Sequence, residues 1–170
     1  MFGVFLCYRR IDKGAARRLK DVFVERLGPA NVFLDVDAIG FEYGSDFRTV
    51  MQETMGIVSA VVVVIGQGNW AGRLWEPDDV VRMELREALA QERIIVPVLV
   101  DSATMPKSRE YPPELADIAF LNAAQLRTDR HFDQDAKRVL AGIGLVLAQR
   151  MGKAKGWDFI RNPDGTTNAL

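Results

Sequence analysis

Short apolar runs alternate with amphipathic segments along most of this chain. The runs are rich in β-branched and aliphatic residues and are barely interrupted, as expected of strands that are buried on both faces. They occupy residues 2–8, 31–36, 59–65, 94–100 and, more weakly, 118–126. In the segments between them, apolar residues recur at intervals of three and four, which predicts helices with one buried face. These segments are residues 13–28, 46–57, 77–91 and 132–149, and one short helix is expected after Pro112-Pro113.

Local signals mark where the longer helices begin and end. Gly28 and Pro29 are expected to stop the first helix, because glycine suits a helix end and proline cannot continue one. Ser45 or Asp46 is expected to cap the second helix. Pro77 is expected in the first turn of the third helix, where its missing N–H removes no hydrogen bond of the helix.

Strands that alternate with helices predict an α/β domain. The expected architecture is flavodoxin-like: a doubly wound, five-stranded parallel sheet with helices on both faces. Pro97 lacks the N–H that a central strand needs, so its strand is expected near an edge or with a local bulge. We expect residues 1–150 to form this domain. The polar, aperiodic residues 151–170 are expected to be a tail or a linker to a further domain.

Charge and composition narrow the partners and the location. The 22 Lys and Arg residues nearly balance the 23 Asp and Glu residues, so there is no basic field to attract nucleic acid or an acidic membrane. Cys7 is the only cysteine, in keeping with a reducing compartment. The sequence contains neither a signal-peptide pattern nor an apolar run long enough to span a bilayer. We therefore expect a cytoplasmic protein that binds neither membranes nor nucleic acid directly.

Glu84 stands out on the third long helix. At about 100° per residue it falls inside the apolar arc formed by Val80, Val81, Leu85, Ala88 and Leu89. A carboxylate there is partly desolvated, which costs stability unless a ligand or a cation compensates. Alternatively, the side chain bends to the boundary of the helix and pairs with a nearby arginine. Its place in the first half of the helix, near the loops at the strand ends, favours a functional site.

Two further groups of polar residues follow predicted strands. Tyr8 and Arg9 close the first strand, where the guanidinium could clamp a phosphate and the phenol could stack or hydrogen bond. The alternative is a surface pair, Arg9 and Arg10, beside a core tyrosine. Asp35 and Asp37 lie at the end of the second strand with both carboxylates on one side, where they could accept hydrogen bonds from ribose hydroxyls or bind a cation. Alternatively, they only form a turn. Both groups lie where parallel sheets bind ligands.

Other motifs carry less weight. Residues 66–71 fit the written form GxGxxA, but they do not run straight into a helix, so we discount them as a dinucleotide-binding loop. Gly66 stands where a receiver domain needs its phosphorylated aspartate, which argues against that class. His131 is the only histidine, which excludes a His-rich metal site and argues against a Ser-His-Asp triad.

Several ordered segments together resemble the TIR (Toll/interleukin-1 receptor) domains of bacteria, in particular the subgroup that cleaves NAD. The similar segments are residues 4–10, residues 32–37 with the glycine-bearing loop to Phe47, residues 78–89 and residues 95–100. The resemblance covers about residues 1–150, and segments in this order are far more specific than any single motif.

The resemblance implies a role for individual residues. Glu84 matches the glutamate that engages the nicotinamide ribose, which makes it the catalytic residue. Tyr8 and Arg9 would line the cleft, Asp35 would support it, and Phe47 would help to enclose the substrate.

Two positions depart from the family pattern. Cys7 stands where many members have serine, which alters a contact in the pocket, and Val80 stands where some catalytic members have tryptophan. Trp70 or Trp75, in the loop before the helix, is expected to supply the missing aromatic surface, and we assign Trp75 to substrate binding.

The implied activity is that of an NAD glycohydrolase. Nicotinamide leaves NAD as a neutral molecule, and a nearby carboxylate stabilises the oxocarbenium-like ribose that remains. No metal or cofactor is needed, since NAD is the substrate, and the product is ADP-ribose or a cyclic form of it.

The resemblance also implies a biological setting. Self-association of TIR domains, aided by the loop after the second strand, would activate the enzyme as an effector of bacterial anti-phage defence, with a sensor domain beyond the C-terminal residues. A non-catalytic TIR–TIR interaction module is the alternative, and a nucleotide-binding domain without hydrolysis is a third hypothesis.

Overall fold

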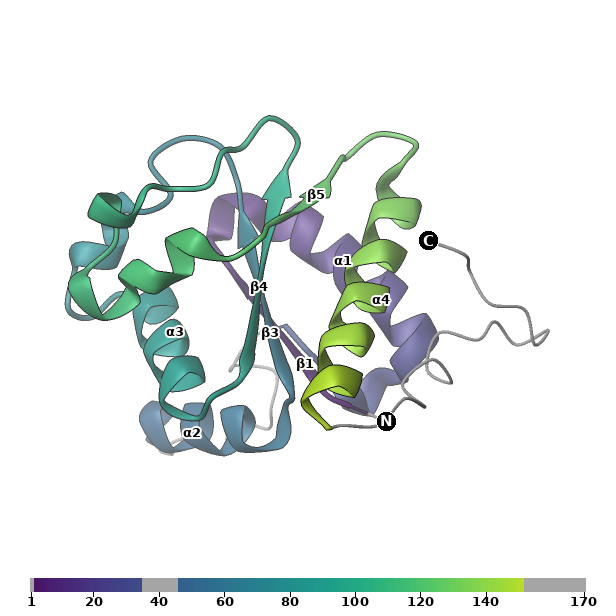
Figure 1. Cartoon of the computed structure of the whole chain (residues 1–170), viewed down its shortest axis with the longest axis horizontal. Helices are drawn as coiled ribbons and strands as arrows, with labels where there is room; N and C mark the ends of the chain where they lie inside the picture. The colour runs from purple at the N-terminus through teal and green to yellow at the C-terminus, as the bar shows by residue number, and fades with distance from the viewer. Residues whose placement is uncertain (1, 35–45, 152–170) are drawn as a thin grey trace.

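The computed structural model describes residues 2–34 and 46–151 of the chain. Within this part, five parallel strands form one sheet in the order β2-β1-β3-β4-β5 (Figure 1). The strands are β1 (Val4–Tyr8), β2 (Val32–Phe33), β3 (Ala60–Ile65), β4 (Ile94–Val100) and β5 (Ala124–Leu126). The α-helices are α1 (Lys13–Leu27), α2 (Phe47–Ile57), α3 (Val80–Ala90) and α4 (Phe132–Arg150). Short 3₁₀ helices are η1 (Arg10–Asp12), η2 (Pro29–Asn31), η4 (Gly72–Trp75), η5 (Ser108–Glu110) and η6 (Pro113–Phe120).

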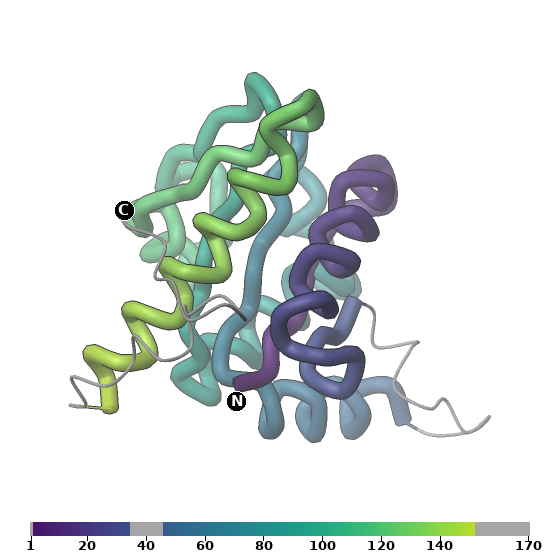
Figure 2. Tube along the Cα trace, turned by 90° about the vertical axis from the view of Figure 1, so that its right-hand side faces the viewer, coloured from purple at the N-terminus to yellow at the C-terminus, as the bar shows by residue number. Residues whose placement is uncertain are grey.

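Helices cover both faces of the sheet, as predicted. α1 and α4 lie side by side over one face, and α2 and α3 lie over the other (Figures 1 and 2). Alternate residues of each strand point to opposite faces, so β1 contributes to two cores. Leu6 packs in the core under α1 and α4, whereas Phe5 and Cys7 pack in the core under α2 and α3. The predicted flavodoxin-like architecture is therefore confirmed. None of the described helices is both long enough and apolar enough to cross a membrane.

Local chemistry explains most helix boundaries. In α1 the buried positions are those that the periodicity indicated, and Gly28 ends the helix with φ +81°, a conformation that only glycine adopts easily. Asp46, one of the two predicted caps, accepts a hydrogen bond from the backbone N–H of Arg48. The prediction for Pro77 was wrong. Pro77 precedes the helix, which begins at Val80 because the Asp79 carboxylate caps it.

The position of Pro97 is also explained. The backbone N–H of Ile94 donates to Ser59 next to β3, so by alternation Pro97 faces away from β3. On that side β5 pairs only with residues from Val98 onward. The register between β3 and β4 continues through Pro97 without a bulge. The nitrogen of Pro97 thus points to the side of β4 where no described strand pairs with this residue. This confirms the predicted position near an edge, and no bulge is needed.

The predicted start of the last strand differs in the structure, and the predicted end of the domain is not tested. Residues 118–120 belong to η6 rather than to the last strand, so β5 has only three residues. α4 extends to Arg150, and residues 152–170 lie outside the described part of the chain. The predicted division at residue 150 therefore stays a prediction.

Candidate functional site

Glu84 lies where α3 crosses the carboxyl end of β1. Its neighbours on the buried face of the helix are Val81, Leu85 and Ala88, and its own exposed fraction is only 5%. The prediction of a carboxylate on the packed face is confirmed, because the side chain does not bend to the exposed boundary of the helix. Val80 and Leu89, which the periodicity also put on this arc, are 44% and 37% exposed, so the buried face is narrower than predicted and they lie at its margins.

Cys7 of β1 is the partner of Glu84 beneath the helix. The thiol is fully buried and shares a hydrogen bond with the Glu84 carboxylate. Burial, followed by the nearby charge of Glu84, raises the pKa of the Cys7 thiol well above its usual value. Because the thiol keeps its proton, it can donate that proton to the carboxylate. Cys7 thereby supplies a donor at the position where the resemblance leads us to expect a serine hydroxyl.

Arg9 directly follows β1, two residues beyond Cys7, and points to the same face. Its side chain is buried, and Nη1 lies 2.5 Å from Oδ1 of Asp79. Nε donates to the backbone carbonyl of Trp70 at 3.2 Å, and the guanidinium carbon lies 5.4 Å from the centre of the Trp70 ring. Arg10, in contrast, is exposed. The two arginines therefore form neither a surface pair nor a joint clamp.

Asp79 and Trp70 link this arginine to other elements. The second oxygen of Asp79 accepts the backbone N–H of Arg82 at 3.1 Å and so caps α3. The indole N–H of Trp70 donates to the carbonyl of Val64 in β3 at 3.1 Å. The end of β1, the loop after β3 and the start of α3 are consequently tied together by one buried group.

Asp12 completes the polar groups at this end of the sheet. The backbone N–H of Gly66 donates to its carboxylate, and a Cβ at Gly66 would lie 1.9 Å from Oδ1 of Asp12. Burial raises the pKa of Asp12, against the lowering effects of the Gly66 hydrogen bond and of Arg9. Nη2 of Arg9 and Oδ2 of Asp12 are buried and have no hydrogen-bond partner in the described part of the chain.

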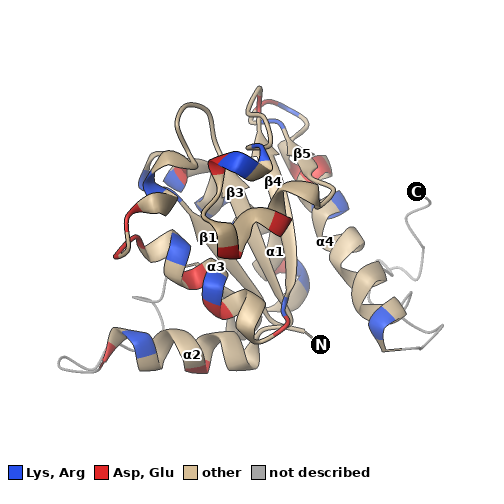
Figure 3. Ribbon diagram, turned by 60° about the vertical axis from the view of Figure 1, so that its left-hand side comes forward, with Lys and Arg blue, Asp and Glu red and all other residues tan. Residues whose placement is uncertain are grey.

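These residues form what we call the carboxyl-end cluster. Its members are Cys7, Arg9, Asp12, Trp70, Asp79 and Glu84. It lies where β1 and β3 end side by side and the chain leaves them in opposite directions, which is where sheets of this order bind ligands. Both basic and acidic positions occur along the ribbon at this end of the sheet (Figure 3).

The other predicted site residues are distributed differently. Tyr8 packs in the core under α1 and α4, on the opposite face of the sheet from Glu84. Phe47 begins α2 and packs, half-buried, in the same core as Cys7. Trp75 is 52% exposed, and its indole N–H donates to Glu110 of η5 at 3.0 Å. Asp35 lies outside the described residues. Their roles in substrate binding stay predictions.

Sequence reasoning missed three members of the carboxyl-end cluster. Asp79 was included only within the family-like segment 78–89, Trp70 was considered only as an alternative aromatic surface, and Asp12 was not considered at all. One signal was available for Arg9. Two-residue alternation puts Cys7 and Arg9 on one face of β1, and therefore both opposite α3.

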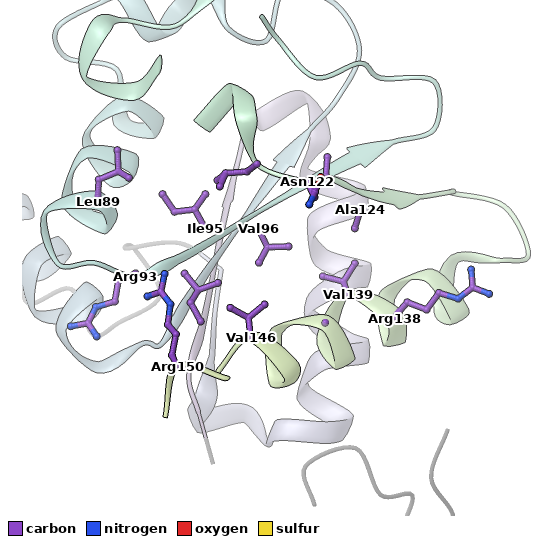
Figure 4. A pocket seen from close by; sticks show the side chains of 14 residues that line it. Leu89, Arg93, Ile95, Val96, Asn122, Ala124, Arg138, Val139, Val146 and Arg150 are labelled. Atoms are coloured by element: carbon purple, nitrogen blue, oxygen red, sulfur yellow. The ribbon is translucent and has the colours of Figure 1, made fainter. Parts of the chain in front are cut away.

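Further concave surfaces lie beside this cluster and away from it in the described part of the chain. A polar pocket of about 360 Å³ lies at the ends of β3 and β4, between loops 66–71 and 102–107, which Gln67 and Ser102 connect by a hydrogen bond of 2.8 Å. A larger groove, of about 530 Å³, lies between β4 and α4 (Figure 4). We call it the β4–α4 groove. It has an apolar floor and three arginines, and Arg93, Ile95, Val96, Arg138, Val139, Val146 and Arg150 are among its lining residues.

Comparison with known protein families identifies the domain. Residues 4–140 match the TIR domain family, which is most of the chain. The chain belongs to the TIR domain family. Among solved structures, this TIR domain is similar to the TIR domains of the activated Roq1 resistosome, which directly recognises the pathogen effector XopQ. The TM-score is 0.62 at 18% sequence identity, covering 84% of this chain and 99% of the other, so the likeness concerns the fold. No curated protein matched the TIR domain described here.

Proposed function

We propose that this TIR domain is an NAD glycohydrolase and that Glu84 is its catalytic carboxylate. The observation that carries the proposal is the placement of Glu84: a buried acidic side chain beside the carboxyl end of β1, held by the thiol of Cys7. Burying a carboxylate costs free energy. That cost is understandable if the charge acts on a ligand in a site that excludes water.

The reaction needs only a positioned negative charge. The bond between C1′ of the ribose and the nicotinamide nitrogen breaks, and its electron pair stays with the nitrogen, so nicotinamide leaves as a neutral molecule. Positive charge develops on C1′ and the ring oxygen, where the Glu84 carboxylate would stabilise it. Water then attacks C1′ and loses a proton, giving ADP-ribose. Attack by a hydroxyl or ring atom of the same molecule would give a cyclic product instead.

The surroundings of Glu84 strengthen this effect. Charges interact more strongly in a buried site than in water, because the effective dielectric constant is lower. The apolar neighbours on α3 and the core under α2 and α3 keep water from one side of the carboxylate. The opposing charges of Arg9 and Asp79 largely neutralise one another. Glu84 therefore supplies a distinct negative charge for the ribose.

We further propose that self-association activates the enzyme, as an effector module in bacterial defence joined to a sensor domain. The similar Roq1 TIR domains are described within a resistosome. The β4–α4 groove suits a second copy of the chain, because it is apolar, rimmed by arginines and open along the uncovered edge of β4 (Figure 4). A partner loop with apolar and acidic residues would complement it. Activity would then rise with protein concentration.

The test is product analysis from NAD by chromatography, at high protein concentration or under crowding. Wild type is compared with Glu84→Gln, which keeps the shape of the side chain and removes its charge. Glu87→Gln is the matched control on the same helix, since Glu87 is only half-buried and accepts a hydrogen bond from Gln91 near the far end of α3. We expect nicotinamide release by wild type and Glu87→Gln, and a loss of at least about 10²-fold in Glu84→Gln.

Equal release by Glu84→Gln and wild type would refute the catalytic role. Wild-type protein that binds NAD without releasing nicotinamide would support the nucleotide-binding hypothesis. Protein that self-associates but neither binds nor cleaves NAD would support the interaction module.

A further inference from the structure

The buried ion pair between Arg9 and Asp79 is an unusual feature of the carboxyl-end cluster. The two side chains are 8% and 3% exposed, and they join segments 70 residues apart in the sequence. Removing two charges from water costs several kcal/mol, and apolar residues in the place of a buried pair are often at least as stable. Stability alone therefore does not explain the pair. What it does provide is geometry, because a charged hydrogen bond fixes both distance and direction.

Asp79 uses its two oxygens for two different purposes. One oxygen binds the guanidinium of Arg9, and the other accepts the backbone N–H of Arg82 in the first turn of α3. The carboxylate consequently connects the end of β1 to the start of the helix. It fixes how far α3 slides along β1 and how the helix is rotated about its axis.

Glu84 depends on both of these quantities. It follows Asp79 by five residues, which corresponds to about 7.5 Å along the helix and a net rotation of about 140°. A small slide or rotation of α3 would thus move the Glu84 carboxylate relative to Cys7 beneath it. Positions of catalytic groups matter at this scale, since a misplacement of about 1 Å can cost about 10²-fold in rate.

Arg9 is equally constrained. Nη1 is bound to Asp79, Nε is bound to the carbonyl of Trp70, and the guanidinium lies over the Trp70 indole. Trp70 is itself anchored to β3. A bidentate clamp on a phosphate needs two free nitrogens of the guanidinium, and only Nη2 is not engaged in the described structure. This arrangement suits a residue that acts through Asp79 better than one that holds a phosphate.

We propose that Asp79 is a positioning residue: through its ion pair with Arg9 and its cap on α3, it sets the position of Glu84 over the end of β1. The inference rests on the proposed NAD glycohydrolase function. It assigns Arg9 mainly to the same task. The predicted effect of breaking the pair is a lower kcat for NAD with little change in KM, because the substrate contacts stay and the catalytic charge moves.

The decisive variant combines Arg9→Met with Asp79→Asn. Asparagine keeps an oxygen to cap α3, and methionine removes the charge that would otherwise be left buried without a partner. The double variant should therefore fold even if the single variant Asp79→Asn does not. Glu114→Gln is the matched control, because it breaks the exposed ion pair that Arg82 of α3 forms with η6 at 2.5 Å. Unfolding midpoint, kcat and KM are measured for each protein.

A second readout does not depend on NAD cleavage. Cys7 is the only thiol in the chain and lies buried beneath α3 beside Glu84. Its rate of alkylation under native conditions reports how firmly the helix is seated. The double variant should react several-fold faster than wild type at a comparable unfolding midpoint, whereas Glu114→Gln should react like wild type.

We expect the double variant to lose about 10- to 100-fold in kcat while Glu114→Gln keeps the wild-type value. Wild-type kcat and a wild-type alkylation rate in the double variant would show that the pair only contributes to folding. A raised KM with unchanged kcat would show that Arg9 binds the substrate, and this too would overturn the proposal. If wild type releases no nicotinamide, the proposed function fails, and the alkylation rates still test whether the pair seats α3.

Discussion

Gly66 shows how a single residue can shape the carboxyl-end cluster. It follows the last residue of β3, and its missing side chain leaves room for the carboxylate of Asp12, which accepts its backbone N–H. The glycine is needed for this close approach rather than for an unusual backbone conformation, since its φ is not positive. The sequence showed only a glycine in a loop. Asp12, the neighbour that requires a glycine there, is 54 residues away in the sequence.

We predict that Gly66→Ala destabilises the domain. The new Cβ would lie 1.9 Å from Oδ1 of Asp12, so the carboxylate or the end of β3 has to shift. Overpacking of this kind typically costs about 1–3 kcal/mol. The measurement is the free energy of unfolding in denaturant.

Gly142→Ala is the control, because an added Cβ at that position within α4 meets no atom within 4 Å. It should stabilise the helix by roughly 0.5–1 kcal/mol. Equal unfolding free energies for Gly66→Ala and wild type would show that Asp12 moves aside without cost.

At the scale of elements, α4 is fixed to the end of the sheet by one carboxylate in its first turn. Asp135 is buried. It accepts two hydrogen bonds from the guanidinium of Arg127, at 2.7 and 2.8 Å, and a third from the backbone N–H of Arg127 at 3.0 Å. Arg127 directly follows β5. Because β5 has only three residues, few hydrogen bonds hold it to β4. The pair between Arg127 and Asp135 therefore helps to fix the end of this strand against α4.

We predict that Asp135→Asn lowers stability in a pH-dependent way. The hydrogen bonds from Arg127 hold the pKa of Asp135 below its usual value in the folded protein. The ionised carboxylate therefore stabilises the fold at pH values above the ordinary aspartate pKa of about 3.9. This contribution is lost as the pH falls through the lower pKa of the folded state.

Thermal unfolding of wild type and Asp135→Asn as a function of pH checks this expectation. The midpoint of the variant should lie below that of wild type at neutral pH, and the two should converge in acid. A constant difference across the whole pH range would mean that the charge of Asp135 is not responsible.

On the scale of the whole molecule, the sheet presents two different surfaces. The carboxyl ends of β1 and β3 carry buried polar groups, whereas the β4–α4 groove is apolar and borders the part of β4 that β5 does not cover (Figures 1 and 4). Elements from both faces of the sheet line this groove, since Leu89 belongs to α3 and Val139 belongs to α4. A second copy bound in the groove would therefore contact α3, the helix that carries Glu84.

We predict that Val146→Glu weakens self-association and, with it, NAD cleavage at high protein concentration. Val146 lines the groove and is 37% exposed, so the substitution puts a charge on the apolar surface without disturbing the core. Ile57→Glu is the control, because Ile57 is 63% exposed at the end of α2 and does not line the groove. Light scattering and nicotinamide release are measured over a range of concentrations. Wild-type association of Val146→Glu would exclude the groove as the interface.

The sequence by itself determined the class of the fold, most of the elements and the location of Glu84 on a buried face. These properties depend on periodicity along the chain, and a strand or a helix imposes its period of 2.0 or 3.6 residues wherever it packs. The same reasoning failed at Pro77, where the carboxylate of Asp79 rather than the proline decides the first turn of α3.

Only the tertiary structure decided which polar groups meet. Arg9 pairs with Asp79, Gly66 accommodates Asp12, and Trp70 lies against the guanidinium of Arg9. Each contact joins segments far apart in the sequence. Such contacts depend on strand order and on the seating of helices over the sheet, which no local pattern of apolar and polar residues specifies.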